Sequence, residues 1–385
     1  MAHMQVPFYR HSLFPENAQL VAKVLETPFL TSGPIGNEVE AQLCEYFGAK
    51  HAKLVNSWTN GAVATLLAMD IGPGDEVIVP TMTFIATANV VELVGAKPVF
   101  IDCDPDTLLI TPELVKAAIT KDTKAIIPVH MYGQMCDVKA IKEIFPKDQK
   151  ISIIEDCAHT FEAKFSGEPP GKYSDASIFS FYATKNVTCG EGGAIITNDE
   201  KLFERIQQAI LHGMSAGAAD RFKAGQYKHW GMDHLGTKAN LPDLLACYLP
   251  EQIRTVDKRL SVREEVAQKY ANALATTKIR FPKVLPGIVH SRHLFPIHVG
   301  SENRDKALLA LGEANIGATV NYRSVHTMGY YSKKYGFSGS EFPVSLSWGE
   351  GTLSIPLFPG ITTQEQDYVI DVLVNKVDKM IGESK

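Results

Sequence analysis

The sequence predicts an α/β fold, in which a mostly parallel central sheet has helices on both faces and is followed by a smaller C-terminal α+β domain. From about residue 38, short apolar segments of strand character alternate with segments of helical periodicity, as in parallel sheets covered on both faces. From about residue 280 the elements become shorter and lose this regular alternation. We therefore expect a large domain at residues 5–245 and a small domain at 246–385 that begins with a long linking helix.

The expected elements of the large domain follow one another with little intervening chain. The expected helices have apolar residues at helical spacing, and Thr111 is an N-cap candidate for one of them. The expected strands are short apolar runs beside turn residues. In chain order, they are a helix at 37–48, a strand leading into a helix at 60–70, a strand ending at Pro80, a helix at 83–95, a strand at 97–104, a helix at 111–120, and strands at 123–130, 151–160 and 177–183.

Two later segments connect the large domain to the small one. Residues 214–231 are rich in Gly, Ala and Lys, and we expect a mobile loop there. Residues 241–275 are expected to be helical, with an interruption at Pro250.

Composition excludes several classes of protein. The chain has 385 residues, 45% hydrophobic residues and a net charge of −5, so no broad basic surface for nucleic acid is expected. No apolar run approaches the length of about 18 residues that a membrane span needs. The opening lacks the pattern of a signal peptide, and the six cysteines have no CxxC spacing, which together favour a reducing cytoplasm. No histidine spacing indicates a metal site, and "HSRH" at 290–293 is expected to be a solvated loop.

Lys185 is the candidate catalytic residue. It follows the apolar run "SIFSFYA" and precedes the glycine-rich "GEGG", which we interpret as a tight turn. A lysine at a strand end is most often a surface residue, but in "SIIEDCAH" Asp156 is expected just past the end of another buried strand. Because parallel strands present their carboxyl ends to one crevice, both side chains can face the same site. An amine and a carboxylate in one crevice suit pyridoxal 5'-phosphate, with the lysine bound to the cofactor and the carboxylate paired with its protonated pyridine nitrogen.

A phosphate site is expected where "VNSWTNGA" passes from a strand into a helix. Ser57, Thr59 and Asn60 supply hydroxyl, amide and backbone N–H groups at a helix start, although ordinary N-capping explains them equally well. Ser180 can add a hydroxyl to the same phosphate, or be only a strand serine. Phe84 can stack on the cofactor ring, or belong to the core.

In these motifs and their order, the sequence resembles the DegT/DnrJ/EryC1/StrS family of sugar aminotransferases, which have the type I fold of pyridoxal phosphate enzymes. The resemblance extends over nearly the whole chain, from "PFLTSGPIGNEVEAQLCEYFG" through "IGPGDEVIVPTMTFIATANVVELVGAKPVFIDCD", "IEDCAHTFEAKF" and "FSFYATKNVTCGEGGAIITND" to "LSIPLFPGIT".

The resemblance implies a role for each matching residue. Lys185 matches the Schiff-base lysine and Asp156 the partner of the pyridine nitrogen. The other cofactor contacts that it implies are Thr59, Asn60, Phe84, His159, Ser180 and Lys238, the last supplied by the partner chain of a homodimer with shared active sites. The substrate contacts that we expect are Thr31, Tyr322 and His326.

This chain departs from the family pattern at several of these places. Trp58 stands where many members have glycine, which narrows the phosphate side of the pocket. Lys238 stands where many have asparagine. Asn321 and Arg323 replace the residues expected near the sugar, so the resemblance transfers substrate identity only weakly.

The function implied is transfer of an amino group, with glutamate as the expected donor and pyridoxamine 5'-phosphate as the intermediate form of the cofactor. The acceptor expected is a nucleotide-linked keto sugar, with a 4-keto-6-deoxy hexose favoured, and the product an amino deoxy sugar for a polysaccharide or a glycosylated metabolite. A dehydratase on the same scaffold would have histidine in place of Lys185. A regulatory member would lack the lysine or have a DNA-binding module. Both alternatives stay open at this point.

Overall fold

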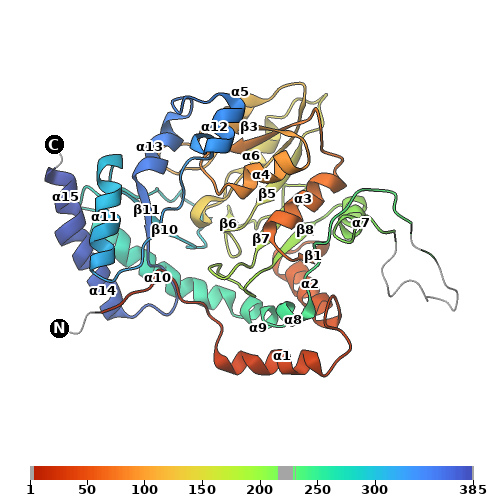
Figure 1. The fold of residues 1–385 in the computed structure, drawn as a ribbon, viewed down its shortest axis with the longest axis horizontal. Helices are drawn as coiled ribbons and strands as arrows, with labels where there is room; N and C mark the ends of the chain where they lie inside the picture. The colour runs from red at the N-terminus through yellow and green to blue at the C-terminus, as the bar shows by residue number, and fades with distance from the viewer. Residues whose placement is uncertain (1–3, 216–228, 230, 384–385) are drawn as a thin grey trace.

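The computed structural model describes residues 4–215, 229 and 231–383, so most of the loop expected at 214–231 lies outside the described residues. A central sheet of seven strands, in the order β1-β8-β7-β5-β4-β2-β3, forms the centre of the larger part of the molecule (Figure 1). β8 is antiparallel to both of its neighbours, and the other neighbouring pairs are parallel. The strands are β1 (His51–Val55), β2 (Glu76–Pro80), β3 (Lys97–Ile101), β4 (Thr123–Ile126), β5 (Ser152–Asp156), β7 (Ala176–Ser180) and β8 (Gly193–Thr197).

Alternation along each strand gives the sheet two apolar faces. In β2, Val77 and Val79 join one core cluster while Ile78 between them joins another. Successive strand side chains point to opposite faces, so a strand with no polar position in its middle must be covered on both sides. The predicted sheet with helices on both faces is therefore confirmed.

Helices cover the two faces. On one face lie α3 (Trp58–Ala68), α4 (Ala86–Leu93) and α7 (Glu200–Ala209). The other face is covered by α2 (Pro34–Phe47), α5 (Pro112–Ala118), α6 (Val138–Glu143), α8 (Asp243–Ala246) and α9 (Leu249–Arg254). Several of these helices begin at a side-chain cap: Ser57, Thr111, Asp137 and Asp199 each accept a hydrogen bond from a backbone N–H in the first turn.

The long segment expected to link the domains forms three helices, α8, α9 and α10 (Val256–Leu274). Pro250 is the second residue of α9, a position where its missing N–H costs nothing, so it begins a helix instead of interrupting one. Side chains of α9 pack with the large sheet, whereas α10 packs with the small domain from Val266 onward. The boundary predicted at 245/246 stays a prediction, and the packing changes within α10.

The C-terminal part has its own core. β10 (Phe295–His298) and β11 (Thr352–Ile355) form an antiparallel pair. The first residues of the described chain join this core through Val6, which exchanges backbone hydrogen bonds with Asn315 and Gly317 at 3.0 and 2.8 Å. The helices α11 (Ser301–Glu313), α14 (Thr363–Val372) and α15 (Asp378–Glu383) pack around this core, whereas α12 (Gly329–Tyr335) and α13 (Pro343–Gly351) place Tyr331 and Trp348 in core clusters of the large part.

A few short elements complete the fold. The two-residue strands β6 (Lys164–Phe165) and β9 (Ile288–Val289) pair with each other, and α1 (Ala18–Leu25) lies along one edge of the molecule in Figure 1. Short 3-10 turns occupy Pro15–Asn17, Met131–Gly133 and Val325–Thr327, and a π-helical turn spans Leu373–Val377. Among the described residues, no helix is both long and apolar enough to cross a membrane.

Candidate active site

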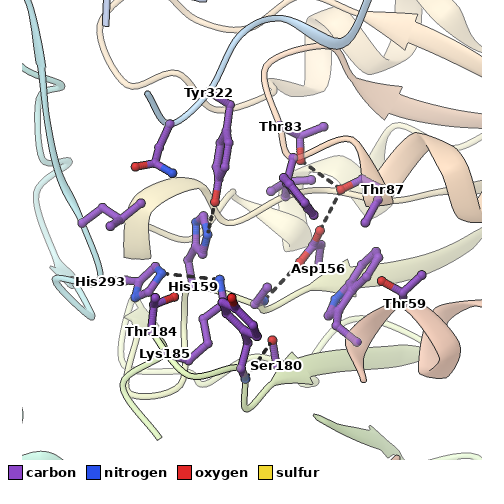
Figure 2. Close-up of a pocket in the computed structure, with 18 of the residues that line it drawn as sticks. Thr59, Thr83, Thr87, Asp156, His159, Ser180, Thr184, Lys185, His293 and Tyr322 are labelled. Carbon is purple, nitrogen blue, oxygen red and sulfur yellow. Dashed lines mark hydrogen bonds between the residues drawn. The ribbon is translucent and has the colours of Figure 1, made fainter. Parts of the chain in front are cut away.

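A cavity of about 580 Å³ opens at the carboxyl ends of the parallel strands, where α/β sheets bind their ligands. Asp156 ends β5 and Ser180 ends β7, and both line this cavity (Figure 2). The small domain closes one side with Thr319, Asn321 and Tyr322. The other lining residues include Phe8, Ser57, Trp58, Thr59, Thr83, Phe84, Thr87, His159, Tyr182, Thr184, Lys185, Glu191 and His293.

Lys185 is held in the tight connection between β7 and β8. Its backbone N–H donates to Tyr182 O at 2.9 Å, and Tyr182 in turn forms a bridge with Gly190. Gly190 has a φ of +88°, a left-handed conformation that favours glycine, which explains the "GEGG" turn. Burial lowers the pKa of Lys185 to about 8, against the opposing effect of the Asp156 carboxylate. Near neutral pH, this amine therefore loses its proton far more readily than an exposed lysine does.

Asp156 is 6% exposed and accepts two hydrogen bonds. Thr87 Oγ1 donates to Oδ2 at 3.0 Å, and the Ala158 N–H donates to Oδ1 at 3.1 Å. Burial raises the pKa of Asp156, while Ala158, Thr87 and Lys185 oppose this rise. The Thr87 hydroxyl and the Ala158 N–H both donate to the carboxyl group, and such hydrogen bonds favour its ionised form.

His159 lies between the large and small domains. The Tyr132 N–H donates to its Nδ1 at 3.2 Å, so a neutral ring must have its proton on Nε2, which lies 3.2 Å from Tyr322 Oη (Figure 2). Burial lowers the pKa of His159 well below its ordinary value, and Lys185 adds to the effect. The neutral imidazole of His159 and the Tyr322 side chain thus form one wall of the cavity. The centroids of the Phe84 and Tyr322 rings are 5.6 Å apart.

The start of α3 faces the cavity with polar groups. Ser57 Oγ accepts from the Asn60 N–H at 3.1 Å, and Ser57, Trp58 and Thr59 line the cavity. The first backbone N–H groups of a helix have no partner within the helix, so this end favours an anion. Trp58 Nε1 is buried without a hydrogen-bond partner among the described residues, which leaves one more donor unsatisfied beside the cavity.

Within one chain, four of the predicted site residues do not line the cavity. The Asn60 amide donates to Asn56 Oδ1 at 2.9 Å, and Lys238 is exposed. Thr31 is exposed and accepts from the Asn240 amide at 3.1 Å. His326 is buried, with Nδ1 2.7 Å from Thr81 Oγ1 and Nε2 3.1 Å from Gly339 O.

The structure also brings in residues that the sequence did not indicate. The expectation of a solvated loop at 290–293 is wrong, because Ser291 and His293 are 0% and 5% exposed. This segment packs beneath α10, and His293 lines the cavity. Thr87, which donates to Asp156, was also not identified from the sequence. The signal was its position at the start of α4, a helix that begins shortly after the end of β2.

A second group of chemically active side chains, His130, Glu155 and Cys157, lies buried near the end of β5. The Cys136 N–H donates to His130 Nδ1 at 3.0 Å, so His130 Nε2 donates to Glu155 Oε2 at 2.6 Å. The other carboxylate oxygen accepts from Gly171, Ser174 and Ser177. These hydrogen bonds use the lone pairs that a metal ion would need, so the cluster is explained as a polar network.

Comparison with known proteins gives consistent results along the chain. Residues 12–374 match the sequence model of the DegT/DnrJ/EryC1/StrS aminotransferase family. Spr1654 from Streptococcus pneumoniae, described as a sugar aminotransferase and solved in its PMP form, superposes with a TM-score of 0.91 at 28% identity, covering 98% of this chain and 100% of that one.

Two further solved structures are similar at 30% identity. DesV from S. venezuelae, in complex with a ketimine intermediate, has a TM-score of 0.87 over 97% of this chain and 99% of its own. A DegT DnrJ EryC1 StrS aminotransferase from Brucella abortus has a TM-score of 0.83 over 94% of this chain and 95% of its own.

Proposed function

The chain belongs to the DegT/DnrJ/EryC1/StrS aminotransferase family, and on this premise we propose that it transfers an amino group from glutamate to a keto sugar linked to a nucleoside diphosphate. The observation that supports the proposal most is the pairing of Lys185 and Asp156 in one cavity, beside the start of a helix. These are the groups that amino transfer on a cofactor requires. They also disfavour the dehydratase and regulatory alternatives, which need another residue at 185 or a further module.

The cofactor is pyridoxal 5'-phosphate, since the family depends on it and Spr1654 was solved in both its PMP and PLP forms. The residues present fit this group. The cavity has a buried amine, a hydrogen-bonded carboxylate and the start of a helix, whose first backbone N–H groups have no partner within the helix. When bound, the cofactor supplies an electron sink that stabilises the carbanion formed when the substrate loses a proton.

Lys185 and Asp156 would divide the chemistry. With a pKa of about 8, the Lys185 amine can be a nucleophile that holds the cofactor covalently, and once free it can take and return a proton at the substrate carbon. Asp156 would hold the proton on the pyridine nitrogen, which its hydrogen bonds from Thr87 and Ala158 support by favouring the carboxylate. His159 is neutral and would pack against the ring without adding positive charge.

The remaining predicted contacts are part of the proposal. We assign the phosphate to Thr59, Ser180 and the N–H groups at the start of α3, with Asn60 supporting this turn through its backbone. Phe84 would stack near the cofactor ring, and Tyr322 would face the sugar.

A homodimer with shared active sites is also proposed. Phe84 and Tyr182 line the cavity yet are 53% and 46% exposed in the single chain. Exposed apolar side chains grouped around a ligand cavity are typical of an interface. In such a dimer Lys238, and Thr31 with it, would reach the partner's cavity, which explains their place outside the cavity of their own chain.

The proposed substrate is tested by single-turnover assays. The enzyme in its pyridoxamine phosphate form should be mixed with nucleotide-linked keto sugars that differ in nucleotide and in the position of the ketone, with matched free sugars as controls. Return of the pyridoxal form with a nucleotide-linked sugar, but not with the free sugar, would support the proposal. Equal conversion of free and linked sugars would contradict the nucleotide requirement, and conversion of no sugar would contradict the acceptor class.

A further inference from the structure

A buried ion pair lies behind the active site and has no part in the chemistry above. Arg263 of α10 binds Glu162, which follows β5, and the two side chains are 2% and 0% exposed. Removing both charges from water costs free energy, so a protein with apolar residues in place of such a pair is often equally stable, and the pair is weak evidence for a stabilising role. Its contacts therefore raise the question of what the pair holds in place.

The pair fixes the orientation of Asn186, the residue after Lys185. Asn186 Nδ2 lies 3.0 Å from Glu162 Oε2 and 2.9 Å from Ser291 O. Arg263 Nε donates to the same Ser291 O at 3.2 Å. Glu162 and the Ser291 carbonyl present oxygen atoms that accept, so the amide nitrogen must face them. The carbonyl oxygen of the Asn186 side chain is thereby turned toward His293.

This orientation determines where His293 has its proton. Asn186 Oδ1 lies 3.3 Å from His293 Nδ1 and can only accept, so Nδ1 is protonated. In a neutral imidazole the other nitrogen then has a lone pair, and this Nε2 lies 3.4 Å from Lys185 Nζ. Figure 2 shows the two side chains directed toward each other at the edge of the cavity.

We propose that His293 is a positioning residue for Lys185, held by Asn186 in the tautomer whose unprotonated Nε2 accepts a hydrogen bond from the amine. The proposal rests on the role assigned to Lys185 above. An acceptor on Nζ stabilises the ammonium form more than the amine. His293 therefore orients the amine and keeps its proton available near neutral pH.

The charged and titratable groups around this contact are consistent with a neutral imidazole. Lys185, His159 and Arg263 face His293, and burial together with these groups lowers the pKa of His293 well below its ordinary value. The ring of His159 lies 4.5 Å from that of His293 and is itself neutral. On its other side Lys185 faces Asp156, whose carboxylate raises the pKa of the amine.

The first test measures the proton on His293 directly. Protein labelled with ¹⁵N-histidine, without cofactor, gives two-bond ¹H–¹⁵N correlations that distinguish protonated from unprotonated ring nitrogens, and the His293→Gln variant assigns the signal. We expect a protonated Nδ1 and an unprotonated Nε2 at neutral pH. In Asn186→Leu, which leaves His293 in place, this preference should be lost. A protonated Nε2 in the wild type would overturn the proposal.

The second test measures the pKa of Lys185 in the protein without cofactor, from the pH dependence of its acylation rate by peptide mass spectrometry. His293→Leu replaces the acceptor by an apolar side chain of similar size, so the pKa should fall by about one unit. His293→Gln keeps an acceptor and should restore most of this shift. His290→Gln, in the same loop, is the matched control and should leave the pKa unchanged.

The result is independent of whether the enzyme transfers amino groups. If His293→Leu and the wild type have the same Lys185 pKa, the positioning role is wrong even when the cofactor binds normally. If the predicted shift is found but no cofactor becomes attached to Lys185, the proposed function fails and the hydrogen bond stands.

Discussion

Two sets of predicted site residues differ in how the fold places them. Asp156 and Ser180 end strands β5 and β7, His159 and Lys185 follow these strands, and one chain brings all four to one cavity. Thr31, Asn60, Lys238 and His326 lie outside that cavity. We call the first the strand-end group and the second the outlying group. Strand ends are located by the apolar pattern of the sheet, whereas the outlying positions depend on local capping, on packing between domains or, in the proposed homodimer, on a second chain.

The largest effect should follow from changing the strand-end group at Lys185. Lys185→Ala should reduce amino transfer by at least about a thousandfold, because it removes both the covalent attachment and the proton carrier. The fold should be retained, because the substitution removes a buried amine with a lowered pKa and does not remove a side chain that packs in the core. Steady-state kinetics and a thermal melt measure the two results, and activity close to wild type would remove Lys185 from the centre of the account.

Asp156→Asn should have the next largest effect. An amide retains the size of the side chain but cannot hold the proton on the pyridine nitrogen by charge, so kcat should fall by about 100- to 1000-fold, or about 3–4 kcal/mol. The cofactor should still bind. Near-normal turnover would show that another group pairs with the ring nitrogen.

His326 distinguishes the outlying group from the strand-end group. Both of its ring nitrogens are engaged, by Thr81 and by Gly339 O, so the structure gives it a role in joining elements. His326→Ala should lower the free energy of unfolding by about 2–4 kcal/mol, because Thr81 loses a buried partner. Denaturation of the holoenzyme measures this change. A raised KM for the sugar with unchanged stability would instead support the substrate contact expected from the sequence.

Lys238 should have a smaller effect on cofactor affinity. A phosphate close to doubly charged is only partly neutralised by helix N–H groups, so Lys238→Ala should weaken cofactor binding by about tenfold. Titration of the protein without cofactor measures this change.

Subunit exchange then tests whether Lys238 acts across the dimer. Mixing the inactive Lys185→Ala variant with Lys238→Ala gives heterodimers in which one site has both lysines, so activity should rise above that of either parent. An active monomer, or a mixture no better than its parents after verified exchange, would place Lys238 outside the partner's site.

The sequence predicted the sheet and the strand-end group for a physical reason. Strands with apolar side chains on both faces require covering helices, and a polar side chain at the carboxyl end of such a strand, as at Asp156, lies at the ligand-binding edge. The sequence could not show that His293 is buried, because "HSRH" has the polarity of a solvated loop and its burial depends on Arg263, 30 residues earlier on α10. It also could not place His326, whose two partners come from separate segments.

The central claim is that Lys185 is the attachment point of the cofactor, and borohydride reduction tests it most directly. The purified enzyme should be yellow, and reduction should fix the cofactor covalently to the protein. Peptide mass spectrometry should then find the added mass on the peptide containing Lys185, and Lys185→Ala should show no added mass. Modification of Lys238 or of any other lysine in the wild type would contradict the account.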